Sequence, residues 1–349
     1  MSAFSSKFSA MESATSSSAD AAACMQGGDV CSSCQPQTAS PELEAGLPRQ
    51  TRVRAWERPL ENGRPAANSI QKIHRRWDRF VRLVGDAAVL RLLNTHVAVV
   101  GLGGVGSYAA EALARSAVGR LTLIDFDDVC LTNVNRQLQA LPGTVGQSKA
   151  QLLAARVQAI HPEALVEPLQ AFYDQSTSAA LLDPVPDVVI DAIDNVTSKV
   201  LLLETCVRKG IPVISVTGSG ARLDPTQVRI ADLSRTKIDP LARVLRKELA
   251  RRGIGGDGDS GIPVVYSEEE IRQPIPPAWD AEQGFQCICP HNEDSPHACE
   301  RRRQIYGTAA FMTAAFAMAA VSWVVKRVTN TTAQSPGDTR ECQAQAVQG

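Results

Sequence analysis

The sequence carries almost no net charge, because its 36 basic residues nearly cancel 37 acidic ones and leave a formal charge of −1. An overall basic field that would attract nucleic acid is therefore absent, and any such contact must come from a local patch. No basic start followed by an apolar run is present, so no signal peptide is predicted. Nine cysteines among 349 residues do not suggest a disulfide-stapled secreted domain and favour a reducing compartment.

Sustained apolar periodicity is missing from residues 1–68, where Ser, Ala, Gly and Pro dominate. We predict a disordered tail there, a folded domain over residues 69–330 and a second disordered tail over residues 331–349. The Ser-rich start has Lys7 as its only basic residue before Arg49, whereas a transit peptide is rich in Arg and poor in acid. We therefore expect a cytoplasmic protein, with association with mitochondria as the alternative.

Short apolar runs alternate with helical patterns through the folded part. Strands are predicted at residues 96–100, 121–124, 188–193 and 213–216, and helices at residues 75–93, 107–116, 147–160 and 240–252. This alternation is typical of an α/β fold with a doubly wound, mainly parallel Rossmann-like sheet. Residues 228–233 alternate in polarity and predict an antiparallel extension of that sheet.

A long uncharged run, residues 307–325, just reaches the length of a membrane span. The run is rich in Ala and is interrupted by Thr308, Thr313 and Ser322. Small residues suit close packing against a sheet, so the sequence favours a buried C-terminal helix. Association with a membrane stays open as the alternative.

A Gly-rich loop follows the first predicted strand. Gly101 permits a tight turn, Gly103 lets a phosphate approach the backbone, and Gly106 lets the next helix pack closely on the strand. Asp125, at the end of the second strand, is placed to accept hydrogen bonds from a ribose. These residues predict an adenine nucleotide but do not separate NAD from ATP.

Three charged residues beyond this loop favour ATP. Arg136 and Lys149 fall at or just beyond the carboxyl end of the second strand, and Asp194 closes the third strand. Attack of a carboxylate on the α-phosphate of ATP builds negative charge, which Arg136 and Lys149 would neutralise. Asp194 would hold an Mg²⁺ ion that bridges the phosphates. Each cation taken singly also fits a solvated surface charge, but the ordered set favours adenylation.

Two parts of the sequence resemble a known family. The stretch VVGLGGVGSYAAEALARSAVGRLTLIDFDDVCLTNVNRQLQAL and the later motifs DPTQV, DL and DPLA resemble the tRNA threonylcarbamoyladenosine dehydratases, within the ubiquitin-activating-enzyme superfamily. The later motifs are the more discriminating, because they lie outside the nucleotide core that the superfamily shares. The resemblance covers roughly residues 77–327.

This resemblance implies that residues 69–330 form an adenylating ATP-binding domain. Its substrate would be tRNA carrying threonylcarbamoyladenosine beside the anticodon. Adenylation of the carboxylate would be followed by ring closure with net loss of water. The ATP-binding residues implied in this way are Gly101, Gly103, Gly104, Gly106, Asp125, Asn133, Arg136, Gln137, Lys149, Asp194 and Asn195. The implied catalytic residues are Arg136, Lys149, Asp194 and Arg82, and the implied cofactors are ATP and Mg²⁺.

The superfamily also suggests partners. Its members are usually homodimers in which an arginine near the start of the fold enters the partner's site, and Arg82 is the first candidate here, with Arg79 second. A tRNA substrate needs phosphate contacts, for which the candidates are Arg243, Arg246, Lys247 and Arg251 in one helical stretch. A second basic cluster at Arg301, Arg302 and Arg303 offers the same chemistry. Solvated helix faces explain either cluster equally well.

Three other functions compete with this prediction. An adenylyltransferase for a ubiquitin-like sulfur carrier commonly holds zinc between two CxxC pairs, whereas the folded part here offers Cys287, Cys289 and Cys299 in another pattern. The tail holds Cys24 and a single CxxC pair, Cys31 and Cys34, without a second pair at zinc spacing. Whether the protein has a sulfur-transfer partner stays an open question.

The second alternative, an NAD-dependent oxidoreductase, leaves Arg136 and Lys149 unexplained. The third is a non-catalytic scaffold, and the intact set of glycines, Asp125, Arg136, Lys149 and Asp194 argues against it.

Overall fold

The structure, a computed structural model, describes residues 75–256, 258–278 and 306–329. Both predicted tails lie outside these residues. The cysteines and arginines of the predicted tail and cluster also lie outside them, namely Cys24, Cys31, Cys34, Cys287, Cys289, Cys299, Arg301, Arg302 and Arg303, so the predictions made for them stay predictions.

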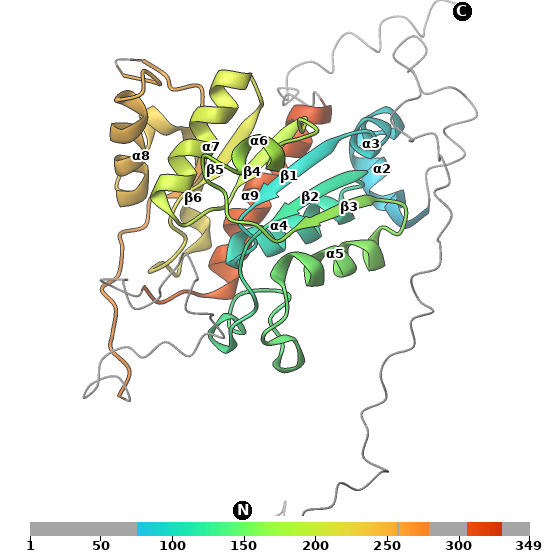
Figure 1. Ribbon diagram of the computed structural model, residues 1–349, viewed down its shortest axis with the longest axis horizontal. Helices are drawn as coiled ribbons and strands as arrows, with labels where there is room; N and C mark the ends of the chain where they lie inside the picture. Colours follow the sequence, from blue (N-terminus) through green and yellow to red (C-terminus); the bar gives the residue numbers. More distant parts are fainter. Residues whose placement is uncertain (1–74, 257, 279–305, 330–349) are drawn as a thin grey trace, which may run out of the picture. The chain divides into compact units, whose positions relative to one another are not determined.

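Seven strands of the described residues form a single sheet in the order β3-β2-β1-β4-β5-β7-β6 (Figure 1). Their bounds are β1 His96–Val100, β2 Arg120–Ile124, β3 Leu165–Leu169, β4 Val188–Asp191, β5 Val213–Val216, β6 Val228–Asp232 and β7 Pro263–Ser267. Every neighbouring pair is parallel except β6 and β7, which are antiparallel. The predicted doubly wound sheet and its antiparallel extension are both confirmed.

Helices cover both faces of this sheet. One face packs against α3 Asp86–Leu93, α4 Gly104–Arg115, α5 Lys149–Ile160 and α9 Ala310–Thr329. The other packs against α6 Ser178–Leu181, α7 Val196–Lys209 and α8 Pro240–Ala250. The helix α2, Asp78–Val84, precedes α3. Because both faces are covered, the central strands carry the continuous apolar runs expected of a parallel sheet, and all five residues of β1 are buried.

The structure differs from the sequence-based prediction at several elements. Residues 75–93 form a short 3-10 turn and two helices rather than one, because Gly85 adopts φ +83° between α2 and α3. Strand β3 was not predicted, since it is a half-exposed edge strand whose apolar residues are interrupted by Glu167 and Pro168. Strand β7 and helix α7 were also absent from the prediction.

The C-terminal helix α9 is built into the core. Met312, Phe316, Ala320 and Val324 follow a helical spacing and are fully buried, and the helix lies against α4 (Figure 1). Within the described residues, α9 is also the one helix whose length and apolar composition would let it cross a membrane. Its packing against α4 and the sheet agrees with the predicted buried helix.

Candidate nucleotide site

The Gly-rich loop connects β1 to α4 in the way the sequence predicted. Gly101 has φ +89°, and its amide donates to the Ile124 carbonyl over 2.8 Å. A Cβ atom at Gly101 would lie 2.6 Å from the Ala192 carbonyl oxygen, and one at Gly106 would lie 1.8 Å from the Gly101 carbonyl oxygen. Strand and helix can therefore approach this closely only with glycine at both positions.

Gly103 faces open space instead. The nearest atom to a Cβ atom built on it is Nε2 of Gln137, at 3.8 Å. Gly103 precedes the first residue of α4, where free helical amide groups favour an anion. The loop therefore leaves open space at Gly103, and the predicted contact with a phosphate there stays a prediction.

Two alanine substitutions should separate packing from ligand binding. Gly106→Ala is expected to lower the free energy of unfolding by about 3 kcal/mol, because α4 must move away from β1. Gly103→Ala is expected to change that free energy by less than about 1 kcal/mol, yet to weaken ATP binding roughly tenfold by blocking close phosphate approach. Urea unfolding and calorimetric titration with ATP measure the two effects. Parent-like ATP affinity in a folded Gly103→Ala protein would show that the phosphates bind elsewhere.

Asp125 braces the loop from the end of β2. One carboxylate oxygen accepts the Leu102 amide hydrogen over 2.6 Å, and the other accepts that of Asp127 over 2.8 Å. The side chain is buried, and this burial raises its pKa although the nearby Lys149 ammonium works to lower it. Asp125 thus stabilises the conformation of the Gly-rich loop, and its predicted contact with a ribose stays a prediction.

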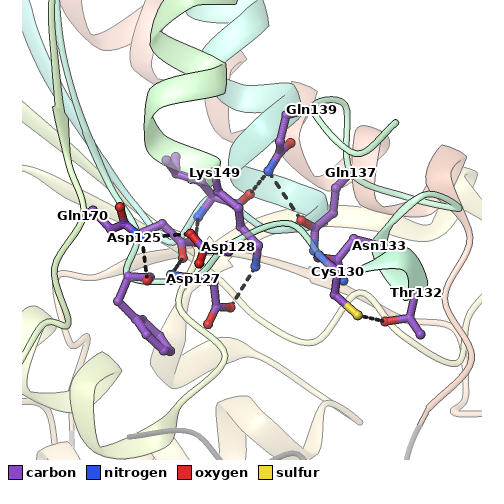
Figure 2. A network of polar contacts seen from close by, with 12 residues as sticks. Asp125, Asp127, Asp128, Cys130, Thr132, Asn133, Gln137, Gln139, Lys149 and Gln170 are labelled. Carbon is purple, nitrogen blue, oxygen red and sulfur yellow. Dashed lines mark hydrogen bonds and ion pairs between the residues drawn. The ribbon is translucent and has the colours of Figure 1, made fainter. Parts of the chain in front are cut away.

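Lys149 begins α5 and points toward the same edge of the sheet (Figure 2). Its ammonium lies 2.8 Å from Oδ2 of Asp127, and the residue is only 5% exposed. Burial works to lower the pKa of Lys149, but the carboxylates of Asp125, Asp127 and Asp194 outweigh that effect and raise it. Lys149 is therefore a fixed cation at the candidate site, and Asp127, which the sequence-based prediction omitted, holds it there.

Arg136 is held by its own loop. Its Nη1 atom donates to the Thr132 carbonyl over 2.7 Å and to Oδ1 of Asn135 over 2.9 Å. Asn135 in turn donates from Nδ2 to the Thr308 carbonyl over 2.8 Å. The guanidinium is therefore positioned by a residue that the prediction did not include, although Asn135 directly precedes Arg136 in the same motif.

Several predicted nucleotide residues shape the loops. Oδ1 of Asn133 accepts the Cys130 amide hydrogen over 3.1 Å, and Oε1 of Gln137 lies 3.4 Å from Nε2 of Gln139 (Figure 2). Asn195 caps α7 by accepting the Ser198 amide hydrogen over 3.0 Å. These three side chains therefore have structural roles, and direct contact with ATP stays a prediction for each.

Asp194 is exposed, three residues beyond the end of β4. A buried ion pair stabilises the turn that carries it. The Lys199 ammonium lies 2.8 Å from Oδ2 of Asp191, and both side chains are fully buried. Lys199 also donates to the Ile193 carbonyl over 3.0 Å, while Oδ1 of Asp191 accepts the Ile193 amide hydrogen over 3.1 Å. The pair thereby sets the backbone that presents Asp194.

The described residues include no group of three or more His, Cys, Asp or Glu side chains that could hold a metal ion by themselves. Mg²⁺ in nucleotide sites usually needs only one or two carboxylates, because phosphates and water complete its shell. The exposed carboxylate of Asp194 fits that limited requirement.

Arg82 does not join the other candidates within the same chain. The Trp77 ring, which precedes α2, packs edge-on against His161 at the end of α5, with 4.6 Å between ring centroids. Lys149 starts that helix, so Trp77 lies roughly 18 Å from it along the helix axis. Arg82 itself is exposed and pairs with Asp78. A catalytic role for Arg82 therefore requires the site of another copy.

The four candidate cations of the predicted basic helix differ in their contacts with the described residues. Nη1 of Arg246 donates to the Thr236 carbonyl over 3.1 Å, so Arg246 packs inward rather than facing a ligand, and Arg251 pairs with Glu248 at 2.6 Å. The side chains of Arg243 and Lys247 are exposed, with no ion pair or hydrogen bond to any described residue. They lie four residues apart and so share one face of α8.

Comparison with known proteins places these features in a family. The family model of the ThiF family matches residues 77–346. The tRNA threonylcarbamoyladenosine dehydratase of Bacillus subtilis is 47% identical over 186 residues, which cover 53% of this chain and 72% of that protein. The enzyme of the same name from Escherichia coli is 38% identical over 256 residues, covering 72% and 93%. The crystal structure of the E. coli enzyme in complex with ATP matches with a TM-score of 0.63 at 36% identity, covering 73% of this chain and 94% of that one.

Proposed function

This chain belongs to the ThiF family, and we propose that it is an ATP-dependent tRNA threonylcarbamoyladenosine dehydratase. The observation that carries the proposal is the convergence of the Gly-rich loop, Lys149, Arg136 and Asp194 at the carboxyl edge of the sheet. Relatives of that name are 47% and 38% identical to this chain, and the E. coli enzyme has been crystallised with ATP. The alternative, an adenylyltransferase for a sulfur carrier, is less well supported.

The proposal gives each charged group a task. The substrate carboxylate attacks the α-phosphorus of ATP, pyrophosphate leaves, and a mixed anhydride with AMP forms. Lys149 and Arg136, each held in place before the reaction, offset the negative charge that builds on the phosphates. A nucleophile within the threonylcarbamoyl group then attacks the activated carbonyl carbon, and AMP leaves as the ring closes. Mg²⁺, held by Asp194 and the phosphates, would neutralise further charge.

The direct test is incubation with ATP, Mg²⁺ and tRNA that carries threonylcarbamoyladenosine, followed by mass analysis of the released nucleosides. A loss of one water from that nucleoside, with one AMP formed per product, is the expected result. ATP–pyrophosphate exchange measured without tRNA provides the comparison with the sulfur-carrier alternative. If exchange requires a small carrier protein and the nucleoside keeps its mass, this assignment is wrong.

A homodimer with Arg82 acting in the partner's site belongs to the same proposal. Arg82 stands on an exposed helix beside Leu83, whose side chain is 78% exposed, so α2 offers both a charge and an apolar contact. We further propose a cytoplasmic location, with association with mitochondria as the alternative. A sulfur-transfer partner protein stays a prediction from the resemblance alone.

Reversing the charge of Arg243 and Lys247 should weaken tRNA binding. The helix α8 starts at the carboxyl edge, because its capping residue Asp239 accepts a hydrogen bond from Thr217, just beyond β5. The Arg243→Glu/Lys247→Glu variant is therefore expected to lose affinity and to flatten the logarithmic salt dependence by about two units, as about two phosphate contacts disappear. Filter binding at several salt concentrations measures both quantities.

A matched control changes the same charge elsewhere. Lys326→Glu/Arg327→Glu acts at the end of α9, where the Thr329 carbonyl accepts a hydrogen bond from Arg91 at the opposite edge of the sheet. It should leave the salt dependence unchanged. Equal losses in both double variants would show a general charge effect and remove α8 from the tRNA surface.

A further inference from the structure

The loop after β5 lies next to the candidate nucleotide site but has no role in the function proposed so far. Strands β4 and β5 are parallel neighbours with Asp191 opposite Ser215. Asp194 and Thr217 therefore follow adjacent strand ends at the carboxyl edge, where α/β sheets bind ligands. The loop runs from Thr217 through Gly218, Ser219 and Gly220.

Buried charges make this loop rigid. Arg222, 2% exposed, donates from Nη2 to Oδ2 of Asp239 over 3.0 Å and from Nη1 to the Gly218 carbonyl. The same carboxylate oxygen of Asp239 accepts the Thr217 hydroxyl over 3.0 Å. Thr217, which precedes the glycine segment, and Arg222, which follows it, therefore both bind Asp239. The backbone between them is thus organised before any ligand binds.

Three consecutive amide groups inside this loop have no hydrogen-bond partner among the described residues. The amides of Gly218, Ser219 and Gly220 donate to no described residue, and all three residues are half-buried. A Cβ atom on Gly218 would approach nothing more closely than 3.8 Å. Consecutive backbone amide groups in a turn can bind an anion, and the substrate of adenylation presents a carboxylate.

An exposed aromatic residue, Tyr306, begins next to Gly220 of this loop. Tyr306 is 46% exposed, and its Cβ atom lies 3.4 Å from the position that a Cβ atom on Gly220 would occupy. The following carbonyl, that of Gly307, accepts the Ala221 amide hydrogen over 2.7 Å. The next one, that of Thr308, accepts the Asn135 side chain that also holds Arg136. The backbone that carries Tyr306 is therefore anchored on one side to the loop after β5 and on the other to Asn135, the residue that holds Arg136.

We propose that Tyr306 stacks on the purine base of the nucleoside whose carboxylate is adenylated, with that carboxylate directed toward the amides of Gly218–Gly220. The inference rests on the proposed function and identifies where the same site would hold the nucleoside that receives the adenylyl group. A modified base in a single-stranded tRNA loop must leave its stack to reach the enzyme, and proteins commonly receive such bases on an aromatic side chain. The Phe126 and Phe172 rings, 5.0 Å apart, follow β2 and β3, on the other side of β1 and β4 from the loop after β5.

Binding of the free nucleoside threonylcarbamoyladenosine to the protein with a non-hydrolysable ATP analogue tests the proposal without turnover. Tyr306→Ala is expected to weaken nucleoside binding roughly 10- to 100-fold, the usual loss of one base–aromatic stack, while affinity for the ATP analogue stays within about twofold of the parent. Tyr306→Phe keeps the ring and should bind the nucleoside like the parent. The kcat/KM for the modified tRNA should follow the same order.

Phe311→Ala is the matched control, because Phe311 is an aromatic residue of similar exposure, 53%, five positions further along. It should leave nucleoside affinity unchanged. Parent-like binding by Tyr306→Ala, or equal losses in Tyr306→Ala and Phe311→Ala, would overturn the proposal. A parent enzyme that binds the nucleoside but forms no cyclic product would instead contradict the proposed function, and the binding series would still test Tyr306.

Discussion

The Arg136→Ala variant is expected to form AMP from ATP and modified tRNA roughly 100- to 1,000-fold more slowly than the parent, while remaining folded. A preorganised donor aimed at transition-state charge contributes about this factor when it is removed. Arg136 would fit that description under the proposed function, because Thr132 and Asn135 hold its guanidinium in the absence of a ligand. Asp194→Ala should cause a comparable loss, because the proposal gives Asp194 the role of holding Mg²⁺ on the phosphates. Rapid-quench measurement of AMP, together with circular dichroism, checks both variants.

Two further variants test whether the rate of AMP formation depends on the position of the Arg136 guanidinium or on charge alone. Asn135→Ala leaves the charge of Arg136 but removes one of its anchors, so an intermediate rate is expected. Arg115→Ala removes an exposed arginine of α4 that pairs with Glu111, and it should keep the parent rate. If Arg136→Ala or Asp194→Ala made the cyclic product at the parent rate, the assignment of the candidate site would be wrong.

The second large effect concerns stability. Lys199→Met is expected to lower the free energy of unfolding by about 3–5 kcal/mol, because it leaves the fully buried carboxylate of Asp191 without its cation. Ser215 also donates to Asp191 over 2.7 Å, but a hydroxyl cannot replace a full charge. Guanidinium-induced unfolding, followed by fluorescence, measures the change.

The control for this prediction lies on the same helix. Lys209→Met removes an exposed lysine from the last turn of α7 and should alter the free energy of unfolding by less than about 0.5 kcal/mol. In the Lys199→Met/Asp191→Leu variant no buried charge is left unpaired, so part of the lost stability should return. A Lys199→Met protein within about 1 kcal/mol of the parent would show that this buried ion pair does not hold the fold together.

The central strands could be predicted because they are buried on both faces, and such strands consist almost entirely of apolar residues. The run at His96–Val100 is buried at every residue, so a continuous apolar segment is its natural pattern. The edge strand β3 gives no such signal, since solvent on one side permits Glu167 and Pro168. Lys199 also escaped prediction, because a lysine in an amphipathic helix normally indicates a solvent face.

The candidate site could be predicted as a set of residues but not as a set of contacts. Motif order brings Gly101, Asp125 and Asp194 to one edge, since parallel strands end together. The pairing of Lys149 with Asp127 depends on side-chain geometry that spacing does not reveal. The contact between Asn135 and Thr308 joins residues 173 positions apart, beyond the reach of any local pattern.

The packing of α9 has a consequence for synthesis of the chain. Strands β1 and β2 and helix α4 leave the ribosome before α9, which completes their apolar face. Thr313 of α9 lies against Gly104, with Cγ2 only 2.8 Å from the position that a Cβ atom there would occupy. The Gly-rich loop thus acquires its final support only after α9 has been made, so a chain that terminates before α9 should be unable to retain ATP.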